Sequence, residues 1–244
     1  MTYCVAMRLD AGLVFLSDSR TNAGVDHINT FRKMHVFEKA GDRVLVLMTS
    51  GNLSISQAVV NTLRERLAST DGSNLDRVQN MYEAAKHVGD CLREVHARDA
   101  DALGKFGVDF AAALIIGGQI KGEEPRVFCV YAAGNFIEAT RDTPYFQIGE
   151  SKYGKPIIDR VINPKTSLDE AAKCALISMD STIRSNLSVG MPLDLVSYER
   201  DALKVRHHVN IEQDNAYYAE IRQQWGEHLR QGFAELPAPD WANL

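Results

Sequence analysis

Thr2 is a residue whose side chain and position could together do chemistry. It follows Met1 directly, and a methionine before a small residue such as threonine is normally removed after synthesis. The mature chain would then carry a hydroxyl and a free α-amine on one residue, and that amine can act as the base that activates the hydroxyl. A nearby lysine cation would lower the amine's ordinary pKa of about 8 and favour the neutral base. The simpler alternative is that Thr2 only begins a strand.

The elements that must position Thr2 follow from the hydrophobic pattern. Alternation over 2–9 predicts a strand, which a turn at 10–12 joins to a second strand over 13–17. Further strands are expected at 33–38, 44–49, 109–116, 126–132, 136–139, 146–148, 193–198 and 202–209. Helical periodicity predicts helices at 52–67, 75–98 and 215–233, and further helices are expected at 153–161 and 167–185. Loops are expected at 21–30 and 99–107, and Ser167 with Glu170 forms a capping-box pattern.

This order of elements predicts an α+β fold with antiparallel sheets. Runs of strands alternate with helices and do not follow a strict βαβ pattern, and two sheets packed face to face would explain strands that are apolar throughout. No interdomain linker interrupts the chain, so we expect one domain over 1–244, with 234–244 as an extended tail.

Composition argues against several classes of function. The 244 residues are 45% hydrophobic, and a net charge of -5 without a basic block argues against nucleic acid or an anionic membrane as partner. No segment approaches transmembrane length and no signal-peptide pattern opens the chain, so a cytoplasmic location is expected. The four cysteines are dispersed, and the sequence contains no HExxH, GxGxxG or Walker motif. We therefore expect no disulfide framework, no metal and no cofactor.

The segment TYCVAMRLDAGLVFLSDSRTNAG, followed by TFRKM, resembles the N-terminal stretch of proteasome β-type subunits. In that family the mature chain begins with threonine, a hairpin follows, the second strand ends in Asp-(Ser)-Arg, and a lysine lies on the third strand. Thr2, Asp18, Arg20 and Lys33 match these positions. The stretch LVLMTSGN is similar to the family's strand-Gly-helix turn. The opening is most similar to the bacterial branch called Anbu, the ancestral β-subunit, and more distant from HslV.

The resemblance covers the order of elements along the whole chain but is specific at residue level only over 1–55. It implies a four-layer αββα sandwich, the N-terminal nucleophile (Ntn) hydrolase fold, with two antiparallel sheets between helix layers. It also implies that Thr2 Oγ is the nucleophile, that Lys33 supplies positive charge beside the hydroxyl, and that Asp18 holds Lys33. Taken singly, Lys33 could be a solvated lysine and Asp18 a turn residue at the end of a strand.

The resemblance extends to four further positions around the nucleophile. The amide of Ser50 or Gly51 would bind an oxyanion, although an ordinary helix start also favours these residue types. Ser151 in IGESKYG and Ser188 in SNLSVG match the family's serines near the nucleophile amine. The family's aspartate is missing, because its position holds Ser185 with Asn186 beside it. Asp26 and His27 lie where the family has the rim of the substrate pocket, or in a plain surface loop.

These residues lead us to expect a threonine peptidase or amidohydrolase that acts through an acyl ester on Thr2. Relatives assemble into rings or ring-like spirals, so we expect a homo-oligomer with the Trp225-bearing helix and the tail as candidate interfaces. Two alternatives stay open. One is an amide hydrolase or acyl transferase of the same fold that acts on a small metabolite. The other is a scaffold subunit whose activity decayed, which the missing aspartate and the bulky Tyr3 would suit. The sequence identifies neither a substrate nor an ATPase partner.

Overall fold

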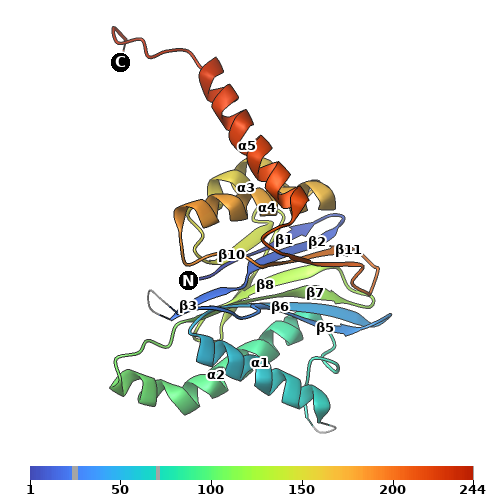
Figure 1. Ribbon diagram of the computed structural model, residues 1–244. Helices are drawn as coiled ribbons and strands as arrows, with labels where there is room; N and C mark the ends of the chain where they lie inside the picture. Colours follow the sequence, from blue (N-terminus) through green and yellow to red (C-terminus); the bar gives the residue numbers. More distant parts are fainter. Residues whose placement is uncertain (24–26, 70–71, 244) are drawn as a thin grey trace.

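Two antiparallel sheets of five strands each lie face to face, and helices cover the outer face of both (Figure 1). The computed structural model describes residues 1–23, 27–69 and 72–243. Together the layers form the four-layer αββα sandwich that the resemblance implies, and the predicted α+β fold class is confirmed.

The first sheet positions the start of the chain and has the strand order β10-β1-β2-β11-β12. Its strands are β1 (Tyr3–Leu9), β2 (Gly12–Asp18), β10 (Tyr145–Gly149), β11 (Leu193–Glu199) and β12 (His207–Ile211). Its outer face is covered by α3 (Lys155–Val161) and α4 (Leu168–Ser185). The capping box predicted for α4 is present, since Ser167 and Glu170 exchange side chain-to-backbone hydrogen bonds.

The second sheet has the order β5-β6-β7-β8-β9. Its strands are β5 (Met34–Lys39), β6 (Arg43–Gly51), β7 (Ala112–Ile120), β8 (Arg126–Val130) and β9 (Phe136–Glu138). The helices α1 (Leu53–Ala68) and α2 (Met81–Lys105) pack on its outer face. Along the chain, β2 of the first sheet is followed by a small two-stranded hairpin of β3 (Arg20–Ala23) and β4 (His27–Thr30), and then by β5 of the second sheet.

The strand β1 is buried on both faces, which explains its apolar sequence. Tyr3, Val5 and Met7 pack into the core between the first sheet and its helices. Cys4 and Ala6 pack into the core between the two sheets. The alternation in the sequence thus places side chains in two different cores. Thr2 immediately precedes this strand.

Several predicted boundaries are wrong. The expected loop at 21–30 contains the β3–β4 hairpin, whose polar residues give no apolar alternation; Asp26 lies outside the described residues. The helix predicted from residue 75 begins at Met81, where Asn80 caps it, and it runs through the expected loop at 99–107 as far as Lys105. The strand predicted from residue 202 begins at His207, because Asp201 and Leu203 adopt positive φ angles in the preceding turn.

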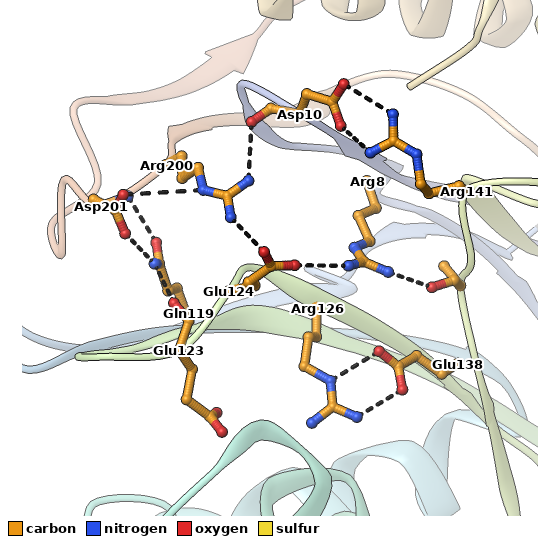
Figure 2. Close-up of polar contacts among 11 residues, drawn as sticks. Arg8, Asp10, Gln119, Glu123, Glu124, Arg126, Glu138, Arg141, Arg200 and Asp201 are labelled. Carbon is orange, nitrogen blue, oxygen red and sulfur yellow. Dashed lines mark hydrogen bonds and ion pairs between the residues drawn. The ribbon is translucent and has the colours of Figure 1, made fainter. Parts of the chain in front are cut away.

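The end of the sandwich opposite Thr2 is tied by ion pairs between segments that are distant in sequence (Figure 2). Glu124, in the β7–β8 turn, pairs with Arg200 at 2.9 Å and with Arg8 at 3.4 Å. Arg141 pairs with Asp10 at 2.7 Å. Exposed pairs of this kind contribute about 1 kcal/mol each at most. The network therefore fixes the positions of the turns at this end without dominating the stability.

The last helix, α5 (Ala216–Glu235), contacts α4 near its start and then extends away from the sandwich (Figure 1). It continues through Glu235, so the first two residues of the predicted tail are helical. The remaining described residues of the tail are exposed. None of the helices in the described part of the chain has the length and apolarity needed to cross a bilayer.

Candidate active site

Thr2 immediately precedes β1 and is buried, with 7% of its surface exposed. The next residue, Tyr3, opens β1 and pairs with Gly149 of β10. The amide of Glu150 donates a hydrogen bond of 2.6 Å to the Thr2 carbonyl oxygen. The neighbouring strand β10 therefore fixes the backbone of Thr2, so the residue has a defined position.

Lys33 and Asp18 form a buried ion pair beside Thr2. Asp18 ends β2. Lys33, the first residue of the predicted strand 33–38, lies immediately before β5, which begins one residue later than predicted. The Lys33 Nζ to Asp18 Oδ1 distance is 2.7 Å, and the two side chains are 6% and 0% exposed. Lys33 Nζ also donates to the Arg20 carbonyl at 2.7 Å and lies 3.4 Å from the Met1 carbonyl oxygen. The carbon of that carbonyl is bonded to the Thr2 nitrogen, so the ammonium lies beside the bond whose hydrolysis would free the Thr2 amine.

Asp18 has the donors that an ionised carboxylate needs inside a protein. Besides Lys33, it accepts hydrogen bonds from the amides of Tyr3 at 3.0 Å and Gly190 at 3.3 Å. Burial raises the pKa of Asp18 above its ordinary value, while the Lys33 ammonium and the two amides act in the opposite direction. Three donors on one carboxylate favour its charged form. Asp18 therefore links the ammonium of Lys33 to the backbone that carries Thr2.

The amine of Met1, at the start of the chain, has a lowered pKa. Burial, followed by the charge of Lys33, lowers the pKa of the Met1 amine below its ordinary value of 8.0, while Asp18 acts in the opposite direction. Desolvation and a neighbouring cation both disfavour an ammonium group. This end of the sandwich therefore favours a neutral amine.

Tyr3 does not fill the space around Thr2, because its ring belongs to the core under α4. Its hydroxyl is paired with Ser178 Oγ at 2.9 Å and accepts from Gln147 Nε2 at 2.7 Å. Burial raises the pKa of Tyr3, although these two hydrogen bonds act against the shift. The bulky residue thus anchors the start of β1 to α4.

Ser50 and Gly51, the expected oxyanion residues, end β6 just before α1 begins. The amide of Thr49 donates a hydrogen bond of 2.9 Å to the Lys33 carbonyl. Ser50 therefore directly follows a residue whose backbone is bound to that of Lys33. Gly51 has a φ angle of 102°, and a Cβ there would overlap the backbone of Ala111, so only glycine fits. Amides at a helix start carry partial positive charge, which suits a developing oxyanion.

Ser151 and Ser188 lie in the two loops that flank Thr2, and both are half-buried. Ser151 follows Glu150 in the loop between β10 and α3, and Ser188 lies between α4 and β11. The amide of Ser188 donates to Asn186 Oδ1 at 2.9 Å. Ser185, which stands at the position of the family's aspartate, is exposed at the end of α4.

Sequence reasoning missed Glu150 and the Gly190 amide. Glu150 is a buried carboxylate whose own amide binds Thr2, and Gly190 donates to Asp18. The available signal was an acidic residue directly after the glycine that ends a short strand. The amide of Gly190 carries no signal in a sequence, because its role depends on how the loop folds.

Gly149 is required for the contact between β10 and Thr2. Its φ angle is 84°, and an added Cβ would overlap the Thr2 carbonyl. We expect Gly149→Ala to lower the free energy of unfolding by about 1–3 kcal/mol more than Gly122→Ala, because overlapping backbone must move apart. Gly122 is a matched control, with a φ angle of 88° and open space around the added Cβ. Chemical denaturation of both variants measures the difference, and equal losses would contradict this role of Gly149.

Comparison with known proteins identifies the family. The family described as "Proteasome subunit" matches residues 2–196. A curated proteasome subunit beta from Haloquadratum walsbyi is 21% identical over 217 residues, covering 87% of this chain and 79% of the relative. Among solved structures, Anbu (ancestral beta-subunit) from Yersinia bercovieri is 55% identical with a TM-score of 0.92, covering 98% of this chain and 99% of that one.

A second solved structure, the helical assembly of the Anbu complex from Pseudomonas aeruginosa, is 51% identical with a TM-score of 0.94. It too covers 98% of this chain and 99% of the other chain. These matches confirm the resemblance drawn from the opening segment. Because the family match covers most of the chain, this protein belongs to the proteasome subunit family.

Proposed function

We propose that this protein is a threonine-type N-terminal nucleophile hydrolase that cleaves peptide or amide bonds. The observation that carries the proposal is the Lys33 ammonium, which lies between the Asp18 carboxylate and the Met1–Thr2 peptide bond. A desolvated cation next to an amine and an alcohol on one residue is the arrangement that activates such a nucleophile. Membership of the proteasome subunit family supports the same reaction class.

The reaction begins once Met1 has been removed. Thr2 Oγ bonds to the carbonyl carbon of the substrate while its proton passes to the Thr2 amine, directly or through water. The negative charge that develops on the substrate oxygen is stabilised by the amide of Ser50 or Gly51. The amine then gives the proton to the leaving nitrogen, and the C–N bond breaks. Water hydrolyses the acyl ester, which restores the hydroxyl and the amine of Thr2.

We further propose that the protein acts as a homo-oligomer. The Anbu complex from Pseudomonas aeruginosa forms a helical assembly. In this chain α5 extends away from the sandwich (Figure 1) and exposes apolar side chains, including Phe233 at 77% and Trp241 at 83% in the segment that follows it. Large apolar residues that are exposed together mark interfaces in soluble proteins. Copies of the chain that cover this helix would bury them.

The pH dependence of hydrolysis tests the role of the amine. In protein that lacks Met1, we expect kcat/KM for a peptide substrate to rise with pH through an apparent pKa below 8.0. The sign follows because only the neutral amine accepts the hydroxyl proton. Burial and Lys33 lower the pKa of the Met1 amine, and we expect them to act in the same direction on the Thr2 amine. A pH–rate profile from about pH 5 to pH 9 measures it. A profile that is flat over this range, or activity that survives acetylation of the amine, would contradict the mechanism.

A further inference from the structure

Glu150 and Asn186 form a polar pair next to Thr2 that the reaction scheme above does not use. Glu150 is 8% exposed, and its Oε2 accepts a hydrogen bond of 3.2 Å from Asn186 Nδ2. Its Oε1 accepts from the amide of Lys152 at 3.3 Å. Among the described residues, no lysine or arginine side chain lies within ion-pair distance of this carboxylate. A carboxylate that is held by neutral donors in a buried position is uncommon away from functional sites.

The pair connects the two loops that flank Thr2. Glu150 binds the Thr2 carbonyl through its own amide, so any movement of Glu150 moves the backbone of Thr2. Asn186 uses both ends of its amide group, since Nδ2 donates to Glu150 and Oδ1 accepts from the amide of Ser188. These two contacts fix the orientation of the Asn186 side chain.

The loop between α4 and β11, which carries Asn186 and Ser188, also contacts the Asp18–Lys33 ion pair. Two residues after Ser188, the amide of Gly190 donates to Asp18 Oδ2, and Asp18 Oδ1 accepts from the amide of Tyr3. A closed series of hydrogen bonds and short backbone segments therefore runs from Thr2 through Glu150, Asn186 and the loop to Asp18. From Asp18 the series returns to the amide of Tyr3, the residue that follows Thr2.

We propose that Glu150 and Asn186 are a positioning pair that holds Thr2 in register with the Asp18–Lys33 ion pair. This inference rests on the proposed function, because it assigns a role in setting the nucleophile. A displacement of about 1 Å is enough to lower the rate of an oriented reaction strongly. The pair acts through the backbone of Thr2 and through the loop that binds Asp18, without contact with the substrate.

Exchanging the carboxylate at position 150 and the amide at position 186 tests the pair while a hydrogen bond between the two positions is kept. Asn186→Asp alone places two carboxylates against each other, and Glu150→Gln alone leaves two amide groups, which lack the acceptor strength of the carboxylate. In the double variant Glu150→Gln/Asn186→Asp, the amide at 150 donates to the carboxylate at 186. That carboxylate still accepts from the amide of Ser188, and the Gln oxygen still accepts from the amide of Lys152.

The readouts are the rate at which a β-lactone acylates Thr2, measured by intact mass, and kcat and KM for a peptide substrate. We expect Asn186→Asp to lower the acylation rate about ten- to a hundredfold, because a buried acceptor loses its donor and like charges meet. We expect Glu150→Gln to lower it about three- to tenfold. The double variant should return to within about threefold of the unmodified protein, with kcat rather than KM following these changes.

Glu138→Gln serves as the control, because it weakens a half-buried ion pair with Arg126 on the second sheet and contacts none of these residues. It should acylate at the rate of the unmodified protein. If the unmodified protein is not acylated at all, the proposed function fails. If it is acylated and both single variants match its rate, the positioning pair is overturned. Losses that follow the thermal unfolding midpoints and are not reversed in the double variant would overturn it as well.

Discussion

Replacing Thr2 by alanine is expected to lower hydrolysis of a peptide substrate by at least about a thousandfold. The variant keeps the amine, Lys33 and Asp18, but it has no hydroxyl to form the acyl ester. Enzymes that lose a covalent nucleophile fall to the residual rate that binding and oxyanion stabilisation supply. Steady-state kinetics on protein whose Met1 removal has been verified by mass measures the effect.

The matched control is Thr2→Ser, which keeps a hydroxyl on the residue that carries the amine. We expect it to retain measurable hydrolysis and to unfold at nearly the same temperature as the alanine variant. Activity in Thr2→Ala close to that of the unmodified protein would exclude Thr2 as the nucleophile. Such a result would favour either a different site or a chain that acts only as a structural subunit.

Lys33→Met is expected to have the second largest effect, because it changes both the chemistry and the stability. It removes the cation next to the Thr2 amine, so we expect hydrolysis to fall by at least about a hundredfold. It also leaves the buried Asp18 carboxylate without its charge partner, 2.7 Å away in the native protein. Removing one member of a buried ion pair typically costs about 3–5 kcal/mol. Kinetics and chemical denaturation of the same preparation measure the two losses.

The double variant Lys33→Met/Asp18→Asn separates these contributions. A neutral amide at position 18 no longer needs the ammonium, and its oxygen can still accept from the amide of Tyr3. We therefore expect the double variant to recover most of the lost stability but none of the lost activity. Recovery of activity along with stability would mean that Lys33 only supports the fold.

The cores of the fold were predictable because apolar side chains repeat with the period of the elements that they bury. In β1 the alternation of Tyr3, Val5 and Met7 with Cys4 and Ala6 indicates a strand between two cores, and the structure places both sets as that pattern requires. The start of the helix α4 was predictable from its capping box. These features depend on residues close together in sequence.

Elements without a buried stripe were not predictable in the same way. The β3–β4 hairpin is polar, and the last turns of α2 as far as Lys105 carry no apolar period after Val95. The start of β12 depends on a turn with positive φ angles at Asp201 and Leu203. Aspartate adopts such angles more often than most residue types, but leucine does not. In each case the structure depends on tertiary contacts or backbone geometry that leaves no periodic mark.

The candidate site likewise contains residues that could be predicted from the sequence and residues that could not. Thr2, Asp18 and Lys33 could be named from their spacing and their resemblance to proteasome β-type subunits, and the structure brings the three together. Glu150 and Gly190 could not, because their contacts with Thr2 and Asp18 cross from β10 to β1 and from the α4–β11 loop to β2. Pairings between segments more than a hundred residues apart follow only from the completed sandwich.

The most direct test of Thr2 as an N-terminal nucleophile is the mass of the purified protein before and after incubation with a β-lactone, followed by peptide mapping. We expect the untreated chain to lack Met1. After treatment we expect one added acyl group, on the hydroxyl of Thr2. A chain that keeps Met1 and takes up no probe, or an acyl group found only on a lysine or a cysteine, would contradict the proposal.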